Sequence, residues 1–229
     1  MLQKLMIVEL VKHLELLRPS PVTCTVAFNS NGGTAVPRQR VKKGEKATQP
    51  SPAPTKTGYT FTEWDKNNVA YNFNTPVTTN FVLDAKWTIN SYTVEFDTDG
   101  GSEVEDQTVN YGGKVTKPED PTKDGYTFDN WYTDDTFATV FDFTNTTISA
   151  DTTIYAKFLE NFTVTFNSDG GSSVDAQTVP DGGTATEPDP APTKADYTFG
   201  EWQLSGVAYD FTTPVTEDIT LVATWTPAG

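Results

Sequence analysis

The sequence predicts a mainly β protein, α+β at most, built from three small modules in tandem. Three observations lead to this fold class. A set of sequence blocks occurs three times in the same order, at offsets of 68 and 70 residues. Apolar residues within the blocks mostly alternate with polar ones, which is the period of a strand with one buried face. The 14 Phe, 9 Tyr and 5 Trp residues also favour strands over helices.

The recurring blocks define the repeat boundaries. Each repeat opens on a strand pattern that ends in Asn-Gly-Gly or Asp-Gly-Gly. It continues through Pro-Thr-Lys into Tyr-x-Phe-x-x-Trp, and it closes on a strand with alanine at its centre. Because the order holds throughout, we divide the chain into an N-terminal helix and linker over residues 1–21 and three repeats over residues 22–90, 91–160 and 161–229.

Local patterns predict about five short strands in each repeat. The Asn-Gly or Asp-Gly pair tolerates positive φ and predicts a tight hairpin between the first two strands. The Pro-rich segment in mid-repeat predicts an extended surface crossover, because proline cannot donate ladder hydrogen bonds. A one-residue break in alternation before the Trp of Tyr-x-Phe-x-x-Trp predicts a β-bulge. In the first repeat, further short strands are expected at residues 71–73 and 83–87.

Short links join the repeats. Only residues 88–91 and 159–161 separate the last strand of one repeat from the first strand of the next. Short links leave neighbouring modules little freedom, so we expect the repeats to lie end to end in an extended rod.

Residues 1–18 predict a short amphipathic helix. Its apolar stripe has helical spacing and is interrupted by charged residues. This segment is neither an uninterrupted secretory core nor the roughly 20 apolar residues of a membrane span, so we expect no membrane span here. Three interpretations stay open: the helix docks on the first repeat, it forms a self-association stub, or it is foreign to the array. The apolar stripe consists of Leu2, Met6, Leu10, Leu14 and Leu17.

The net charge of −15 is unevenly distributed. Residues 22–90 carry a net +4, residues 91–160 a net −11 and residues 161–229 a net −9. A strongly acidic chain lacks the Lys/Arg footprint of a nucleic-acid or anionic-membrane binder, so no nucleic-acid partner is expected. The asymmetry instead predicts a weak, salt-sensitive, head-to-tail self-association between basic and acidic repeats.

The residues that usually carry enzyme chemistry are scarce. The chain has one cysteine, Cys24, and one histidine, His13, so it has no disulfide framework and no zinc-type ligand cluster. Adjacent acids such as Glu105-Asp106 point to opposite faces of a strand and do not converge for acid/base work. We therefore expect no enzyme and no cofactor.

Two kinds of candidate site recur in the repeats. The spacing of Asp97 and Asp99, and of Asn167 and Asp169, resembles the start of a calcium loop, but the further ligands are missing and a plain hairpin turn is favoured. The acidic loop with Asp134-Asp135 is a second place for weak calcium binding between modules. Trp64, Trp131 and Trp202 could stack on sugars, but their recurrence at one strand position favours core packing.

Three blocks resemble the Listeria-Bacteroides repeat, the family that includes the B repeat of internalin B. They are Tyr-Thr-Val-x-Phe-Asp-x-Asp-Gly-Gly from Tyr92, Pro-Thr-Lys-x-Gly-Tyr-Thr-Phe-x-x-Trp-Tyr from Pro121, and Ile-Tyr-Ala-Lys-Phe from Ile154. The resemblance covers about residues 22–227 in three copies. The second repeat fits best; the third has Asp196 where Gly58 and Gly125 stand.

The resemblance implies a β-grasp-like module in bacterial surface or secreted proteins, and it carries over no catalytic residue. The expected function is a structural or adhesive stalk, located outside the cell, that contacts a protein or glycan on a host or neighbouring-cell surface. A carbohydrate-binding array is the alternative, and it requires the three repeated tryptophans to be exposed.

Overall fold

A computed structural model describes residue 9 and residues 22–229 of the chain, and residues 22–229 contain β-strands and no helix. The mainly β fold class is therefore confirmed. Apart from residue 9, the helix expected over residues 1–18 lies outside the described residues. The chain divides into two compact units. The first comprises the chain up to Ser91 together with Asn110–Gly112, and the second comprises Tyr92–Val109 and Gly113–Gly229.

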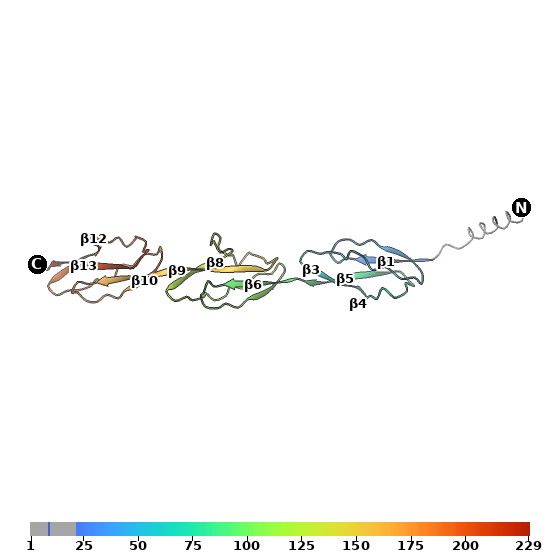
Figure 1. Cartoon of the computed structure of the whole chain (residues 1–229), viewed down its shortest axis with the longest axis horizontal. Helices are drawn as coiled ribbons and strands as arrows, with labels where there is room; N and C mark the ends of the chain where they lie inside the picture. The colour runs from blue at the N-terminus through green and yellow to red at the C-terminus, as the bar shows by residue number, and fades with distance from the viewer. Residues whose placement is uncertain (1–8, 10–21) are drawn as a thin grey trace. The chain divides into compact units, whose positions relative to one another are not determined.

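The first unit contains one mixed sheet of five strands (Figure 1). The strand order is β2-β1-β5-β3-β4. The central strands β1 and β5 are parallel, and the other neighbours are antiparallel. The strands are β1 (Thr23–Asn29), β2 (Gln39–Lys42), β3 (Tyr59–Lys66), β4 (Val69–Ala70) and β5 (Phe81–Ile89).

The second unit contains this arrangement twice, the first time without an equivalent of β4. One copy has the order β7-β6-β9-β8 and the other β10-β9-β13-β11-β12, so β9 belongs to both. The parallel central pairs are β6 with β9 and β9 with β13. The strands are β6 (Ser91–Asp97), β7 (Gln107–Asn110), β8 (Tyr126–Tyr132), β9 (Thr152–Asn167), β10 (Gln177–Pro180), β11 (Tyr197–Leu204), β12 (Val207–Ala208) and β13 (Ile219–Pro227).

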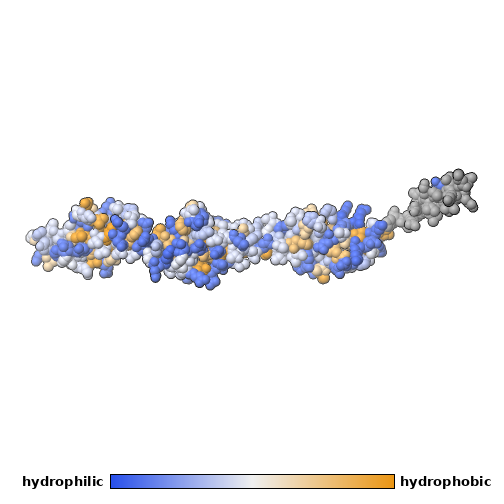
Figure 2. Space-filling model, viewed as in Figure 1, coloured by the Kyte–Doolittle hydropathy of each residue, from blue (hydrophilic) through white to orange (hydrophobic). Residues whose placement is uncertain are grey.

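Each repeat encloses its own hydrophobic core on one face of its sheet. The alternation expected from the sequence is confirmed: in β6, Val94 and Phe96 are buried while Thr93 and Glu95 are exposed. Three separate clusters of buried residues form, one in each repeat. Hydrophilic and intermediate residues, with scattered hydrophobic ones, make up the visible surface of each unit (Figure 2). Three cores in one chain follow from a sequence pattern that is repeated three times.

The β-bulge before the repeated Trp is confirmed in every repeat. The pairing register shifts between Phe61 and Glu63, between Phe128 and Asn130, and between Phe199 and Trp202. The extra residue turns the following Trp back to the core face. With strict alternation, this Trp would lie on the opposite face of the sheet.

The link expected at residues 159–161 is wrong, because these residues lie inside the 16-residue strand β9. Its first part pairs with β6 and its second part with β13. Backbone pairing continues through the join: Asn161 N–H donates to the Gly125 carbonyl (2.9 Å), and the Glu160 carbonyl accepts from Asp181 N–H (2.7 Å). The second and third repeats therefore share a structural element.

Two further local expectations are also corrected. The strand expected at residues 71–73 lies earlier, at Val69–Ala70, because these two residues pair with the last two residues of β3, Lys66 and Asp65. The turn after β1 does not form a tight hairpin, since β2 begins only at Gln39. The chain after that turn pairs with the crossover segment instead: Thr34 N–H donates to the Thr55 carbonyl (2.8 Å).

Candidate functional site

The three repeated tryptophans are core residues. Trp64, Trp131 and Trp202 are 2%, 0% and 2% exposed. Each packs edge-on against a phenylalanine of the first strand of its repeat, with ring centroids 4.9 to 5.1 Å apart. A sugar ring stacks only on an exposed aromatic face, so the condition for a carbohydrate-binding array is not met at this position.

A second aromatic position closes each repeat near the turn. The Nε1 groups of Trp87 and Trp225 donate to the carbonyls of Ser30 and Ser168, at 2.9 and 3.0 Å. Phe158 takes this position in the second repeat. Each ring covers the second glycine of the Gly-Gly pair, and a Cβ at Gly33 would lie 2.4 Å from Trp87 Cζ2. These glycines are needed because the aromatic ring approaches the backbone so closely.

The turn that contains the calcium candidates is held by its own hydrogen bonds. Asp99 and Gly100 have successive positive φ values of 46° and 78°, the backbone signature of a type I′ turn. The Asp97 carboxylate accepts from Asp99 N–H at 2.9 Å. Asp169 has a φ of 43° and donates its N–H to the Asn167 side chain at 3.0 Å. Asp97 and Asn167 therefore use oxygen atoms to stabilise the turn.

A lysine from the Pro-Thr-Lys block binds each turn, a role that sequence reasoning missed. Lys123 Nζ donates to the Asp99 carbonyl (2.7 Å) and lies 3.1 Å from the Asp99 carboxylate. Lys194 donates to the Asp169 carbonyl at 2.7 Å, and Lys56 makes the matching bond at 3.1 Å. Each ammonium also lies over the ring of the tyrosine three residues later. The only signal in the sequence was that the lysine recurs in all three repeats.

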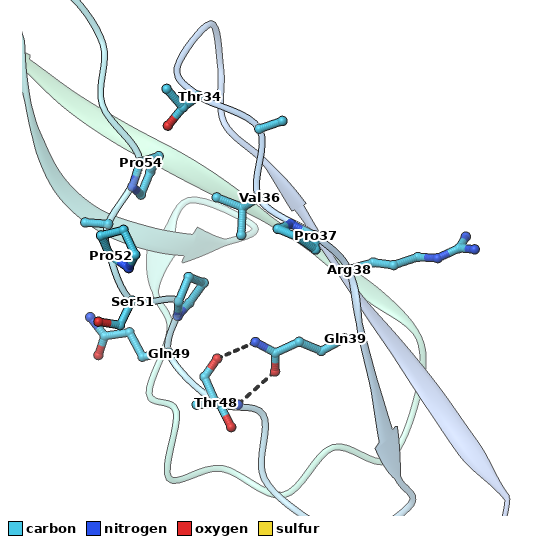
Figure 3. Close-up of a pocket in the computed structure, with 13 residues that line it drawn as sticks. Thr34, Val36, Pro37, Arg38, Gln39, Thr48, Gln49, Ser51, Pro52 and Pro54 are labelled. Carbon is cyan, nitrogen blue, oxygen red and sulfur yellow. Dashed lines mark hydrogen bonds between the residues drawn. The ribbon is translucent and has the colours of Figure 1, made fainter.

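A glutamine side chain holds the crossover segment through two hydrogen bonds to its backbone, an arrangement that we call the glutamine clamp. Gln39 donates to the carbonyl of Thr48 and accepts its N–H, at 2.6 and 2.9 Å (Figure 3). The same two bonds occur at Gln107 and Gln177. Beside the first clamp is a cavity of about 420 Å³ lined largely by proline and small residues. Arg38 points away from it (Figure 3), so the cavity has no charged side chain directed into it that could carry acid/base chemistry.

The acidic loop of the second repeat lies beside its turn. Asp97, Asp99 and Asp135 line one open cavity of about 270 Å³ together with Phe137 and Tyr155. Even so, no group of three or more His, Cys, Asp or Glu residues within the described part of the chain is arranged to hold a metal ion.

The neighbouring Asp134 is used by its own loop. Its carboxylate accepts the Thr136 hydroxyl, and this bond is the main reason that its pKa is lowered from the ordinary value. Bonds from the Thr133 hydroxyl and from the N–H groups of Thr136 and Ala138 lower the pKa further. Asp134 is therefore already occupied as an acceptor within the loop.

We expect calcium to leave the thermal stability unchanged. A ligand stabilises a fold only if it binds the folded state, and the lysines already lie at the turns that hold Asp99 and Asp169. The measurement is the melting temperature in about 10 mM CaCl₂, above the weakest usual extracellular sites, against NaCl of equal ionic strength. A calcium-specific rise that is lost in the Asp97→Asn/Asp99→Asn variant would contradict this expectation.

Comparison with known protein families matches the Listeria-Bacteroides repeat domain three times, over residues 25–86, 92–157 and 162–224. The chain belongs to the Listeria-Bacteroides repeat family. This agrees with the resemblance seen in its motifs. Asp196, the departure at the third repeat, has a φ of 63°, beside 75° at Gly58 and 78° at Gly125. The family's glycine is replaced there by a residue that tolerates the left-handed conformation.

Longer proteins contain relatives of this Listeria-Bacteroides repeat array. A Gly-rich protein of Evansella cellulosilytica whose name assigns it to the membrane is 38% identical over 88% of this chain and 24% of its own length. A second protein of that organism, also named for the membrane, is 38% identical over 88% of the chain and 31% of its own length. Internalin H of Listeria monocytogenes is 42% identical over 48% of the chain and 21% of its own length. The chain spans less than a third of each relative. Within its described residues, no helix is long and apolar enough to cross a membrane.

Proposed function

We propose that this chain is a stalk or spacer segment of a bacterial cell-surface protein, outside the cell and without catalytic activity. Its task is geometric: it sets the distance between a surface and whatever domain the complete protein carries. The names of the relatives, two assigned to the membrane and one an internalin, support the location.

One observation carries the proposal. Three kinds of side chain that recur in all three repeats are used inside the module: the tryptophans are buried, the lysines bind the turns and the glutamines hold the crossover. The recurring tyrosines are partly exposed, but the ammonium of the repeat's lysine lies over each ring. The exposed surfaces differ, since the net charge is +4 in residues 22–90 and −11 in residues 91–160. What the repeats share is therefore a scaffold. A shared binding site would instead require recurring exposed residues that the module does not itself use.

We also infer that each module is a β-grasp variant without a helix. Support comes from the order β2-β1-β5-β3-β4, in which a parallel central pair is flanked by antiparallel strands on both sides. The extended crossover takes the place of a crossover helix, because its prolines disfavour helix and ladder alike. A module of this kind has short edges and termini at opposite ends of neighbouring strands, which suits tandem extension.

Small-angle X-ray scattering of the full chain tests the spacer function. A compact globule of 229 residues has a radius of gyration of about 17 Å. Strands of nine residues are about 30 Å long, so three modules in line give at least about 1.5 times that radius. The measurement is made at high salt, which suppresses association between charged surfaces. A value near 17 Å would exclude a spacer.

A further inference from the structure

The open edge of the first sheet is cationic. β2 is an edge strand, and Arg38, Arg40, Lys42 and Lys43 on and beside it are all exposed. Arg40 and Lys42 point to the face opposite buried Val41, because side chains alternate along a strand. The ion pairs found among residues 22–229 involve none of the four. We call these four residues the cationic strip.

The backbone of this edge is also open. Lys43 N–H donates to the Val22 carbonyl (2.8 Å). The backbone N–H and C=O groups of Lys43, and of every second residue before it along β2, therefore face β1. The N–H and C=O groups of Arg40 and the N–H of Lys42 then face outward, while the Lys42 carbonyl accepts from Glu45 N–H (2.9 Å). In the third repeat, Pro180 stands at the position of Lys42 and removes the outward N–H. Charged side chains on an open edge disfavour pairing with most other strands, but they attract a segment of opposite charge.

The segment that leads into the corresponding edge strand of the second repeat is acidic. Glu103, Glu105 and Asp106 precede β7, are exposed, and take part in none of the ion pairs of the described residues. In the repeat alignment Asp106 stands where the first repeat has Arg38. We call these three residues the acidic segment. The two modules thus carry opposite charges at the start of corresponding edge strands, while β7 itself is uncharged.

We propose that the cationic strip of one chain binds the acidic segment of a second copy, head to tail. Charge complementarity selects this partner: the repeat with the strip has a net charge of +4, and the repeat with the acidic segment has −11. The strip lies on and beside the edge strand of its module, and the acidic segment lies directly before the corresponding edge strand. Such a contact is heterologous, and it builds rings or open chains of molecules. This association does not depend on the spacer function.

Sedimentation of the full chain over a range of concentrations tests the proposal. At an ionic strength of about 0.01 M, where charges act over about 30 Å, the weight-average mass should rise with concentration above that of one chain. At about 1 M, where the range is about 3 Å, it should return to one chain.

A charge swap identifies the surfaces. The strip-reversed variant Arg38→Glu/Arg40→Glu/Lys42→Glu and the acid-reversed variant Glu103→Lys/Glu105→Lys/Asp106→Lys should both sediment as single chains at low salt. The acid-reversed variant separates a specific contact from general charge repulsion. Its three reversals change the net charge from −15 to −9, so repulsion between chains falls, yet association should still be lost. Combining both sets restores the net charge of −15, and association should return.

The outcomes separate the alternatives. A wild-type mass of one chain at every salt concentration, or a combined variant that does not associate, overturns the proposal. Retention of the wild type but not of the strip-reversed variant on a heparin resin, with no self-association, would assign the strip to a polyanionic glycan instead. Because all reversed side chains are exposed, unchanged circular dichroism and melting confirm that each variant is folded.

Discussion

Replacing Trp131 by alanine is expected to unfold the second repeat. Its side chain is fully buried at the centre of a nine-residue core cluster. Deleting a buried Trp side chain costs about 3–5 kcal/mol, and a domain of this size has a total stability of about 4–10 kcal/mol. The measurement is urea unfolding followed by circular dichroism, with limited proteolysis to find the cleaved repeat.

The variant Trp131→Phe is the matched control. Phenylalanine keeps the edge-on contact with Phe96 and removes an indole Nε1 that has no hydrogen-bond partner. Removing a buried, unpartnered N–H offsets part of the lost volume, so a cost of about 1–2 kcal/mol is expected. If alanine and phenylalanine cost the same, or if alanine costs under about 1 kcal/mol, the residue is not the core element described above.

Replacing Gly33 by alanine is expected to destabilise the first repeat by about 3 kcal/mol. The new Cβ would lie 2.4 Å from Trp87 Cζ2 and 3.0 Å from the Thr55 carbonyl oxygen. The indole cannot retreat freely, because its Nε1 donates to the Ser30 carbonyl and its ring packs on Phe61. Urea unfolding gives the stability, and a red shift of Trp emission reports displacement of the ring.

A double-mutant cycle shows whether the ring causes the cost. On a Trp87→Leu background the clash is absent, so Gly33→Ala should cost less than about 1 kcal/mol. Equal costs on both backgrounds would assign the effect to the backbone, and the glycine would then be needed for another reason.

The strand and repeat pattern could be predicted because it is local. Alternation in β6 and the one-residue shift between Phe128 and Asn130 are properties of adjacent residues, and each is visible in the sequence. Core packing of the tryptophans could also be expected, because recurrence at one strand position rarely serves a ligand in every module. The family match agrees with the same blocks.

Partners distant in the sequence were not predictable. In the sequence, Lys123 looks like an ordinary surface lysine. In the structure its ammonium binds the turn at Asp99, 24 residues away. The Gln107 clamp reaches the crossover backbone in the same manner. Recurrence marked both residues as important, but which group each one bonds depends on segments that only the folded chain brings together.

Sequence periodicity established the number of modules and their strand character, and the count of charged residues established the opposite charges of the first two. The tertiary structure decided where the chain pairs: β9 continues through a segment that reads as a link, and the loop after β1 bonds to the crossover instead of forming a hairpin. The physical reason is that every buried backbone N–H and C=O must find a partner, and its nearest partner in space need not be near in sequence.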